Sequence, residues 1–532
     1  MLRLARLFDK VRVLSTLGGI TLGGLMLVLT VPATAQNCPT PPPSITSSTP
    51  PVDVTSTGSN CNPITDFDDF SWRMFVAMIW PALQGQRGVP DTTKSNFPVS
   101  GPLVFETYKA DWESFPPPTA PNPPPAPSPW ADFAGTQNPC GQYTSAGWGD
   151  LVLASYTKFG NLGLAGFGPF LIGPLIAQNQ TYVRYLASYN QTEYTQMLNQ
   201  KLYLQANLGN VTFCSNGATV NGNQCPAENS IDLKSAWMDM TGMPAATMSR
   251  YYTKTAYVLD PATNACSQKT MGLVGLHIVA KTPSRPQWIW STFEQVDNVP
   301  PIGSKPPYTQ KFNFNDGTGT PMPAQSPYCV TGQNGCPPAT PPPSPMPPTA
   351  PAPFNVQRIM PIGINPQSTP ATNTAYQNLL KTAAPNSPWQ FYQLVMTQWP
   401  VPGTPPPNTN PGSPLFTFPG TGATSSFSNV TLETFDQVKV GTGCMNCHNA
   451  TAHPGGAANG NDFLWSLAVN AWAPPTVAPH GALALGKPRL ADSTLASFKS
   501  LKGLLDSAVT TNKAMLKSAE AKAKKKKAEK PQ

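Results

Sequence analysis

The segment Gly443–His448 holds two cysteines and a histidine in the order Cys-Met-Asn-Cys-His. Cys-x-x-Cys-His is the attachment sequence for c-type haem. Two thiols at this spacing form thioethers with the porphyrin, and the adjacent imidazole becomes the proximal iron ligand. The pattern therefore predicts one covalent haem c, attached through Cys444 and Cys447 and ligated by His448. A disulfide or a redox Cys-x-x-Cys with an incidental histidine is the alternative.

The second axial position of that haem iron has several candidate ligands. The only methionine after the motif is Met515, beside a lysine-rich tail, and three further histidines exist. His453 is too close to His448 in the chain to reach the opposite face of the haem, and His480 lies in a loop rich in proline and glycine. We expect His277 to lie near the haem, as distal ligand or as a polar group above an open iron site. A hydrogen-bonded core histidine is the alternative for His277, and an upstream methionine could also ligate.

The stretch that follows His277 is dense in groups that could surround a haem. Lys281, Arg285, Trp288 and Trp290 lie within fourteen residues of the chain that begin at His277. Arginine pairs readily with carboxylates, so Arg285 could bind a haem propionate. A hairpin whose tryptophans pack and whose charges face water explains the same residues equally well.

The first 35 residues have the three parts of a secretory signal peptide. Four basic residues precede the apolar stretch Val13–Val31, and Ala33-Thr34-Ala35 then forms a small-x-small cleavage pattern. We expect cleavage after Ala35 and a location outside the cytoplasm, either periplasmic or secreted. An uncleaved N-terminal membrane anchor is the alternative, because the apolar stretch is long enough to cross a bilayer.

Eight of the ten cysteines lie outside the haem motif. An even number of cysteines in an oxidising compartment indicates disulfides. Short loops favour Cys214–Cys225 and Cys329–Cys336, which leaves Cys38–Cys61 and Cys140–Cys266 by elimination.

The formal charge of +8 comes from the two ends of the chain. Residues 1–35 contribute +3 and residues 513–532 contribute +6, so the remainder is close to neutral, at about −1. No basic face interleaved with aromatic residues is present, and we expect no nucleic-acid partner. The run Lys524–Lys527 is typical of a solvated tail and secondarily of a contact with an acidic partner or a membrane surface.

Sixty-five prolines divide the chain into compact pieces and linkers. Proline-rich runs cannot continue a helix or a central strand. The predicted organisation is a signal peptide (1–35), a Pro/Ser/Thr-rich linker (36–65), an α+β main domain (66–325), a Pro-rich insert (326–353), a haem-binding cytochrome c-like region (354–490), a C-terminal helix (491–516) and a disordered Lys-rich tail (517–532).

Hydrophobic spacing predicts a mixed α+β fold, loop- and proline-rich, with central β-strands, helices towards both ends and a C-terminal haem-binding segment. Apolar residues on one face predict helices over 69–80, 181–204, 388–399 and 495–516. Residues 230–240 form a short amphipathic segment. β-Branched and aromatic residues predict strands over 251–259, 271–281 and 287–293.

Seven stretches of the sequence look familiar as a set: Gly272–Val279, Arg285–Glu294, Val296–Pro300, Asn429–Phe435 and Cys444–His448, with Phe70–Pro81 and Phe105–Lys109. In these stretches the chain resembles the large bacterial exported cytochrome c family proteins that carry a single C-terminal haem motif. That family has no settled activity, so the resemblance implies haem binding and export but assigns no substrate.

Two classes of function follow, and the sequence leaves open whether the chain is an enzyme. A single haem motif favours an electron carrier that works with a redox partner protein. The roughly 400 residues outside the haem region favour a haem-dependent oxidoreductase of peroxidase or oxygenase type, because a carrier needs only about 100 residues around its haem. A haem-stabilised binding protein is a third alternative.

Overall fold

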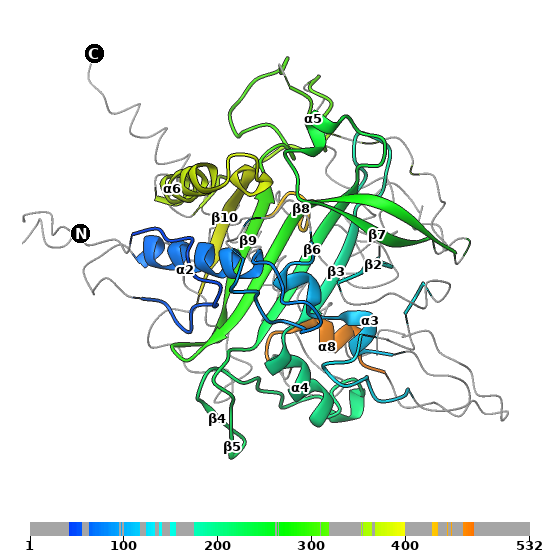
Figure 1. Ribbon diagram of the computed structural model, residues 1–532, viewed down its shortest axis with the longest axis vertical. Coiled ribbons are helices and arrows are strands. Elements are labelled where there is room, and N and C mark those ends of the chain that lie inside the picture. Colours follow the sequence, from blue (N-terminus) through cyan, green and yellow to red (C-terminus); the bar gives the residue numbers. More distant parts are fainter. Residues whose placement is uncertain are drawn as a thin grey trace, which may run out of the picture. The chain divides into compact units, whose positions relative to one another are not determined.

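Eight strands form one mixed sheet, which is the centre of this computed structural model (Figure 1). The α+β class predicted from the sequence is confirmed. The described residues belong to one compact unit, Thr40–Gln532. They are 42–55, 63–94, 97, 101–116, 124–133, 138–140, 149–155, 175–260, 263, 265–308, 310–318, 350, 353, 355–363, 368–399, 428–434, 444, 448 and 461–472.

The long strand β8 (Ala265–Thr282) organises the sheet. One of its edges pairs with β6 (Ile231–Asp239), and the other pairs first with β7 (Thr253–Asp260) and then with β9 (Arg285–Gln295). Beyond β6 the sheet continues antiparallel through β3 (Arg184–Tyr189) to β1 (Lys109–Ala110).

Two further strands extend the sheet beyond β9 and β7. β10 (Tyr392–Gln398) pairs antiparallel with β9, and β2 (Leu151–Leu153) pairs parallel with β7. A bridge between Ser155 and Tyr185 then returns the chain after β2 to β3, so this half of the sheet curls on itself. A separate small hairpin joins β4 (Thr219–Val220) to β5 (Asn223–Gln224).

Two helices cover one face of the sheet (Figure 1). α2 (Pro63–Met78) buries Trp72 fully, and that indole stacks on Tyr376 of α6 (Ser368–Ala383) with ring centroids 5.0 Å apart. Trp72 also meets Phe293 of β9 edge to face at 5.1 Å. Aromatic pairs in these geometries add to the free energy gained by burial, so this contact fixes both helices on β9.

The shorter helices are the 3-10 turns Val104–Thr107, Gln205–Asn207 and Pro388–Phe391, and the helices α3 (Asp111–Ser114), α4 (Gln191–Asn199), α5 (Ala245–Met248) and α8 (Trp465–Asn470). Some of the shorter helices pack in the cluster that contains α2 and α6, and others, such as α4 and α8, pack in the cluster that contains Trp288 and Trp290. No helix of the described ranges has the length and hydrophobicity required to cross a bilayer.

The helix predicted over 69–80 and the strands predicted over 251–259, 271–281 and 287–293 are confirmed as α2, β7, β8 and β9. The helix predicted over 181–204 is wrong in its first half, which is β3, and correct only over α4. The helix predicted over 388–399 is a single 3-10 turn followed by β10. The amphipathic segment 230–240 is β6, and the helix α6 was not predicted from the sequence.

Strands from two of the predicted ranges form the sheet together. β10 comes from the predicted haem-binding region 354–490, whereas its partner β9 comes from the predicted main domain 66–325. The predicted signal peptide, the helix over 495–516 and the lysine-rich tail lie outside the described residues.

Two disulfides are present among the described residues. The predicted short loop Cys214–Cys225 is confirmed, and so is Cys140–Cys266. The pairs Cys329–Cys336 and Cys38–Cys61 lie outside the described residues.

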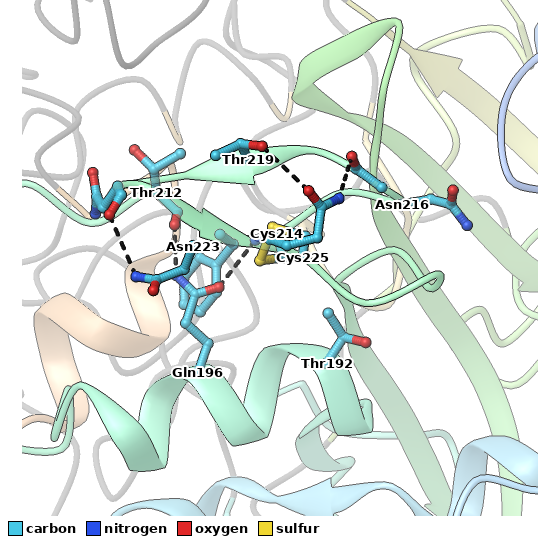
Figure 2. The surroundings of a disulfide bond; sticks show 12 residues. Thr192, Gln196, Thr212, Cys214, Asn216, Thr219, Asn223 and Cys225 are labelled. Carbon is cyan, nitrogen blue, oxygen red and sulfur yellow. Dashed lines mark hydrogen bonds between the residues drawn. A yellow bond between two sulfur atoms is a disulfide. The ribbon is translucent and has the colours of Figure 1, made fainter.

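The Cys214–Cys225 disulfide closes the loop that carries the β4–β5 hairpin, and this loop lies beside α4 (Figure 2). Gln196 of α4 accepts a hydrogen bond at Oε1 from the Cys214 amide at 3.0 Å, and its Nε2 donates to the Thr212 carbonyl at 2.5 Å. The covalent loop therefore also fixes the position of α4.

Candidate haem-binding site

Strands β8 and β9 present a row of large side chains on the face of the sheet opposite α2. Directly opposed residues of antiparallel strands point to the same face. Val279 opposes Trp290, and His277 opposes Thr292, while the intervening Ile278 packs in the cluster that contains α2. The aromatic stretch noted in the sequence is therefore a wall on one face of the sheet.

His448 of the haem motif lies against this wall. The imidazole is buried, and its ring centroid is 4.3 Å from that of Trp290. Nδ1 donates a hydrogen bond to the backbone carbonyl of Phe463 at 2.6 Å. A neutral imidazole that donates from Nδ1 carries its lone pair on Nε2.

Cys444 precedes His448 by four positions, and both residues have helical backbone conformation. Cys444 is half-buried and packs against the cluster that contains Val279, Trp288 and Trp290. Cys447 lies outside the described residues.

The turn that orients His448 has an unusual backbone. Asp462 and Phe463 have φ angles of +50° and +69°, and Trp288 opposite them has +71°. Positive φ is unfavourable for residues other than glycine and persists only where surrounding contacts enforce it. Three such residues therefore meet beside the buried imidazole.

Hydrogen bonds from the sheet side hold this turn in place. Trp288 donates from Nε1 to the Asp462 carbonyl at 3.1 Å. The Asp462 carboxylate accepts from the Phe213 amide at 2.7 Å and from Lys281 Nζ at 2.5 Å. The Phe463 carbonyl is thus fixed in the direction of His448.

The described residues fit a c-type haem on the proximal side. An iron-ligating histidine almost always donates its other ring N–H to a carbonyl or carboxylate, which fixes the ring and raises its basicity. His448 has that arrangement, with an aromatic wall beside it, and Cys444 packs against the same wall.

The segment 428–434 lies over the same face of β8 and β9. Asn429 donates from Nδ2 to Thr292 Oγ1 at 2.9 Å and to the Phe293 carbonyl at 2.8 Å. The Val430 amide donates to Glu294 Oε1 at 2.6 Å. These bonds position Glu433 beside His277.

His277 is buried on β8 and hydrogen-bonded to Glu433. Its Nε2 is 2.8 Å from Glu433 Oε1, and the residue is 6% exposed. An ionised carboxylate can only accept, so Nε2 donates and the lone pair of the neutral ring lies on Nδ1. His277 is also a diagonal cross-strand neighbour of Trp290, a relationship with a separation of about 7–8 Å.

Close backbone approach at Gly275 positions this segment. A Cβ added at Gly275 would lie 2.1 Å from Thr431 Oγ1, which is itself hydrogen-bonded to Asn429. We expect Gly275→Ala to lower the free energy of unfolding by about 1–3 kcal/mol, as overpacking does. Chemical denaturation measures this change.

Gly272→Ala is the matched control. Its added Cβ would meet the flexible side chain of Met240, with Sδ at 2.2 Å, and that side chain can move. A Gly275→Ala variant no less stable than Gly272→Ala would contradict the proposed contact.

The other residues considered from the sequence have different surroundings. Arg285, considered for a haem propionate, is at the β8–β9 turn with its guanidinium over the Phe67 ring at 5.1 Å. His453, His480 and Met515 lie outside the described residues.

Sequence reasoning missed Asp462, Phe463 and the pairing role of Glu433. Glu433 lies within the patch Asn429–Phe435 that carried the family resemblance, so a signal for it was present. The adjacent residues Asp462 and Phe463 belong to no recognisable sequence motif.

Comparisons with protein-family models, curated proteins and solved structures find no match to this chain. The resemblance to the cytochrome c family proteins stays a prediction. The patches that carried it do meet in the fold, since Asn429 and Val430 bind β9, and His448 packs on Trp290.

Proposed function

We propose that this protein is an exported monohaem c-type cytochrome that binds haem through Cys444, Cys447 and His448 and transfers single electrons to or from a redox partner protein. Haem iron supplies the one-electron couple when it is bound. The observation that carries the proposal is the buried His448 imidazole, held by the Phe463 carbonyl within a Cys-x-x-Cys-His sequence.

The chain's own residues act on the proximal side. Phe463 fixes the ring plane of His448 and makes its Nε2 more basic. Trp290 covers the imidazole and excludes water from it. Such control of ligand orientation and solvent access sets the reduction potential of a haem.

Export is supported by the disulfides Cys140–Cys266 and Cys214–Cys225, which are typical of oxidising compartments. A periplasmic or secreted location, with cleavage after Ala35, is therefore part of the proposal. N-terminal sequencing of the exported protein tests it, and a mature chain that begins at Met1 would support the membrane-anchor alternative.

Covalent haem is tested with protein matured alongside haem-attachment machinery. We expect the chromophore to survive acid-acetone extraction and to show a c-type α-band when reduced. The double variant Cys444→Ser with Cys447→Ser should lose covalent haem completely, because no thioether can form.

The matched control is Cys214→Ser with Cys225→Ser, which also removes two cysteines but leaves the haem motif intact. It should keep its covalent haem. Extractable haem, or no haem, in the wild-type protein would exclude a c-type cytochrome.

A haem-dependent oxidoreductase is the second candidate function. The His277–Glu433 pair favours it, because a histidine oriented by a carboxylate is the usual form of a general base. The same pair fits a distal iron ligand equally well, and the variant His277→Ala separates the two roles.

A further inference from the structure

Glu193 is a buried carboxyl group that the proposed haem chemistry has not used. It is fully buried near the start of α4, and neither side-chain oxygen has a hydrogen-bond partner among the residues that the structure describes. A carboxyl left without hydrogen bonds in a protein interior is costly and requires an explanation.

Helix capping does not explain Glu193. A glutamate at this position of a helix often reaches back to the N-cap amide. Here the N-cap is Asn190, whose amide donates to the Ile231 carbonyl at 3.0 Å. Asn190 Oδ1 accepts from the Glu193 amide at 3.1 Å, so the cap is complete without the Glu193 carboxyl.

The charged groups that act on Glu193 come from two strands and one turn. Asp232 and Lys234 of β6, Lys281 of β8 and Asp462 of the turn beside His448 all interact electrostatically with it. Because acids outnumber lysines in this set, the buried cluster is neutral only if one acid is protonated.

Two further titratable groups border this cluster. Asp111 of α3 interacts with Asp232 and Lys234, and burial raises its pKa to about 6. Tyr189 of β3 is fully buried and interacts with Glu193. Neither group supplies a positive charge, so they reinforce the excess of acids.

Burial raises the pKa of Glu193 well above its ordinary value, and the charges of Asp232 and Asp462 raise it further. Burial also lowers the pKa of Lys281, which limits the lysine's capacity to stabilise a glutamate anion. Glu193 is therefore the member of the cluster best placed to hold a proton.

The cluster reaches the haem ligand through one short connection. Lys281 binds the Asp462 carboxylate at 2.5 Å, and the next residue, Phe463, accepts the hydrogen bond from His448. A change of charge at a haem iron bound by His448 would therefore alter the electrostatic potential at the cluster, because interactions between buried groups are weakly screened.

We propose that Glu193 is the redox-linked proton site of this protein, a role that rests on the proposed haem function. When a haem held by Cys444, Cys447 and His448 took up one electron from the reduced partner, the Glu193 carboxylate would bind one proton from solvent and become a carboxylic acid. Reoxidation by an electron acceptor releases that proton. The added electron and the added proton leave the net charge of the buried site unchanged.

The test is the midpoint potential as a function of pH. Reduction makes the site more negative and raises the pKa of Glu193, so between its two pKa values the potential falls as pH rises. A tenfold change in proton concentration then shifts the redox ratio tenfold, which is about 59 mV per pH unit at most. Glu193→Gln should flatten that slope, since the amide has the same shape but cannot titrate.

Glu228→Gln is the matched control. Glu228 accepts a hydrogen bond from Thr192 of α4 at 2.7 Å, and burial raises its pKa as well, but the charges of the cluster do not contribute to that shift. This variant should keep the wild-type slope. Equal slopes in wild type and Glu193→Gln would overturn the proposal.

Infrared difference spectra between reduced and oxidised protein give a second readout. We expect the carbonyl band of a protonated carboxyl group to grow on reduction in the wild type and to be missing in Glu193→Gln. A band retained in that variant would assign the proton to another acid and overturn the proposal. A protein that shows no c-type α-band would contradict the proposed haem function itself. A protein that shows the band but has equal slopes in wild type and Glu193→Gln would contradict only the role of Glu193.

Discussion

Asp462→Ala is expected to lower the free energy of unfolding by about 3–5 kcal/mol, the usual cost of removing one partner of a buried ion pair. Lys281 and Asp462 are 3% and 1% exposed at their side chains. Without Asp462, the buried Lys281 ammonium would lose its hydrogen-bonded counter-charge, and the Phe213 amide would lose its acceptor. Denaturant unfolding followed by tryptophan fluorescence measures the loss.

Two further variants sharpen this prediction. Lys281→Met in the Asp462→Ala background should restore part of the lost stability, because no unpaired charge is then buried. Asp239→Ala is the matched control, since its partner Lys269 is 3.6 Å away and 38% exposed, and such pairs contribute about 0–1 kcal/mol. An Asp462→Ala variant as stable as Asp239→Ala would show that the buried pair is not needed.

The elements that sequence reasoning predicted correctly have one unambiguous spacing. Trp72 and Phe75 of α2 and Ile79, one residue past its end, have the spacing of one helical face, and all three are buried. In β8, a run of twelve buried residues ends at Thr282, rich in β-branched residues, as in strands covered on both faces.

The segments predicted incorrectly have hydrophobic spacings that fit both a helix and a strand. Residues 184–189 alternate between the two faces of a strand, but tyrosine and leucine also fit the helix predicted across them. Asn190 ends the strand and caps α4, a boundary that the longer helical pattern concealed. Residues 392–398 form β10 because they pair with the edge of β9. Such pairing depends on the tertiary structure and cannot be read from the local sequence.

In the candidate site, too, sequence reasoning could find the local motif but not the distant residues that pack against it. The spacing of Cys444, Cys447 and His448 is local and has a known chemical reason, so the motif could be found in the sequence. The groups that orient it come from elsewhere. Phe463 contributes a backbone carbonyl, which any residue possesses, and Glu193 is 255 positions from His448 in the numbering and follows no motif.

The two proposed functions make opposite predictions for His277→Ala. We expect the wild-type haem to be six-coordinate and low-spin, and the variant to become high-spin because it loses the distal imidazole. The structure supports this expectation, since a ligating histidine typically donates its second N–H to a carboxylate, as His277 does to Glu433. Optical spectra of the oxidised and reduced proteins measure the change.

Glu433→Gln is the conservative companion of this variant. The amide can still accept from His277 Nε2, so the iron should stay low-spin, but the imidazole loses a negative partner and becomes a weaker donor. The midpoint potential should therefore rise relative to the wild type. A high-spin Glu433→Gln protein would mean that the carboxylate charge, rather than the hydrogen bond, holds His277 in place.

A high-spin wild type would instead support the oxidoreductase. His277 would then act as a distal base, and His277→Ala would leave the spin state unchanged but slow the reaction with peroxide by about 10²–10⁴-fold. Stopped-flow mixing with peroxide measures that rate. If neither the spectrum nor the peroxide rate changes in His277→Ala, His277 is a core residue whose only role is to bind Glu433 and anchor the segment 428–434 on β8.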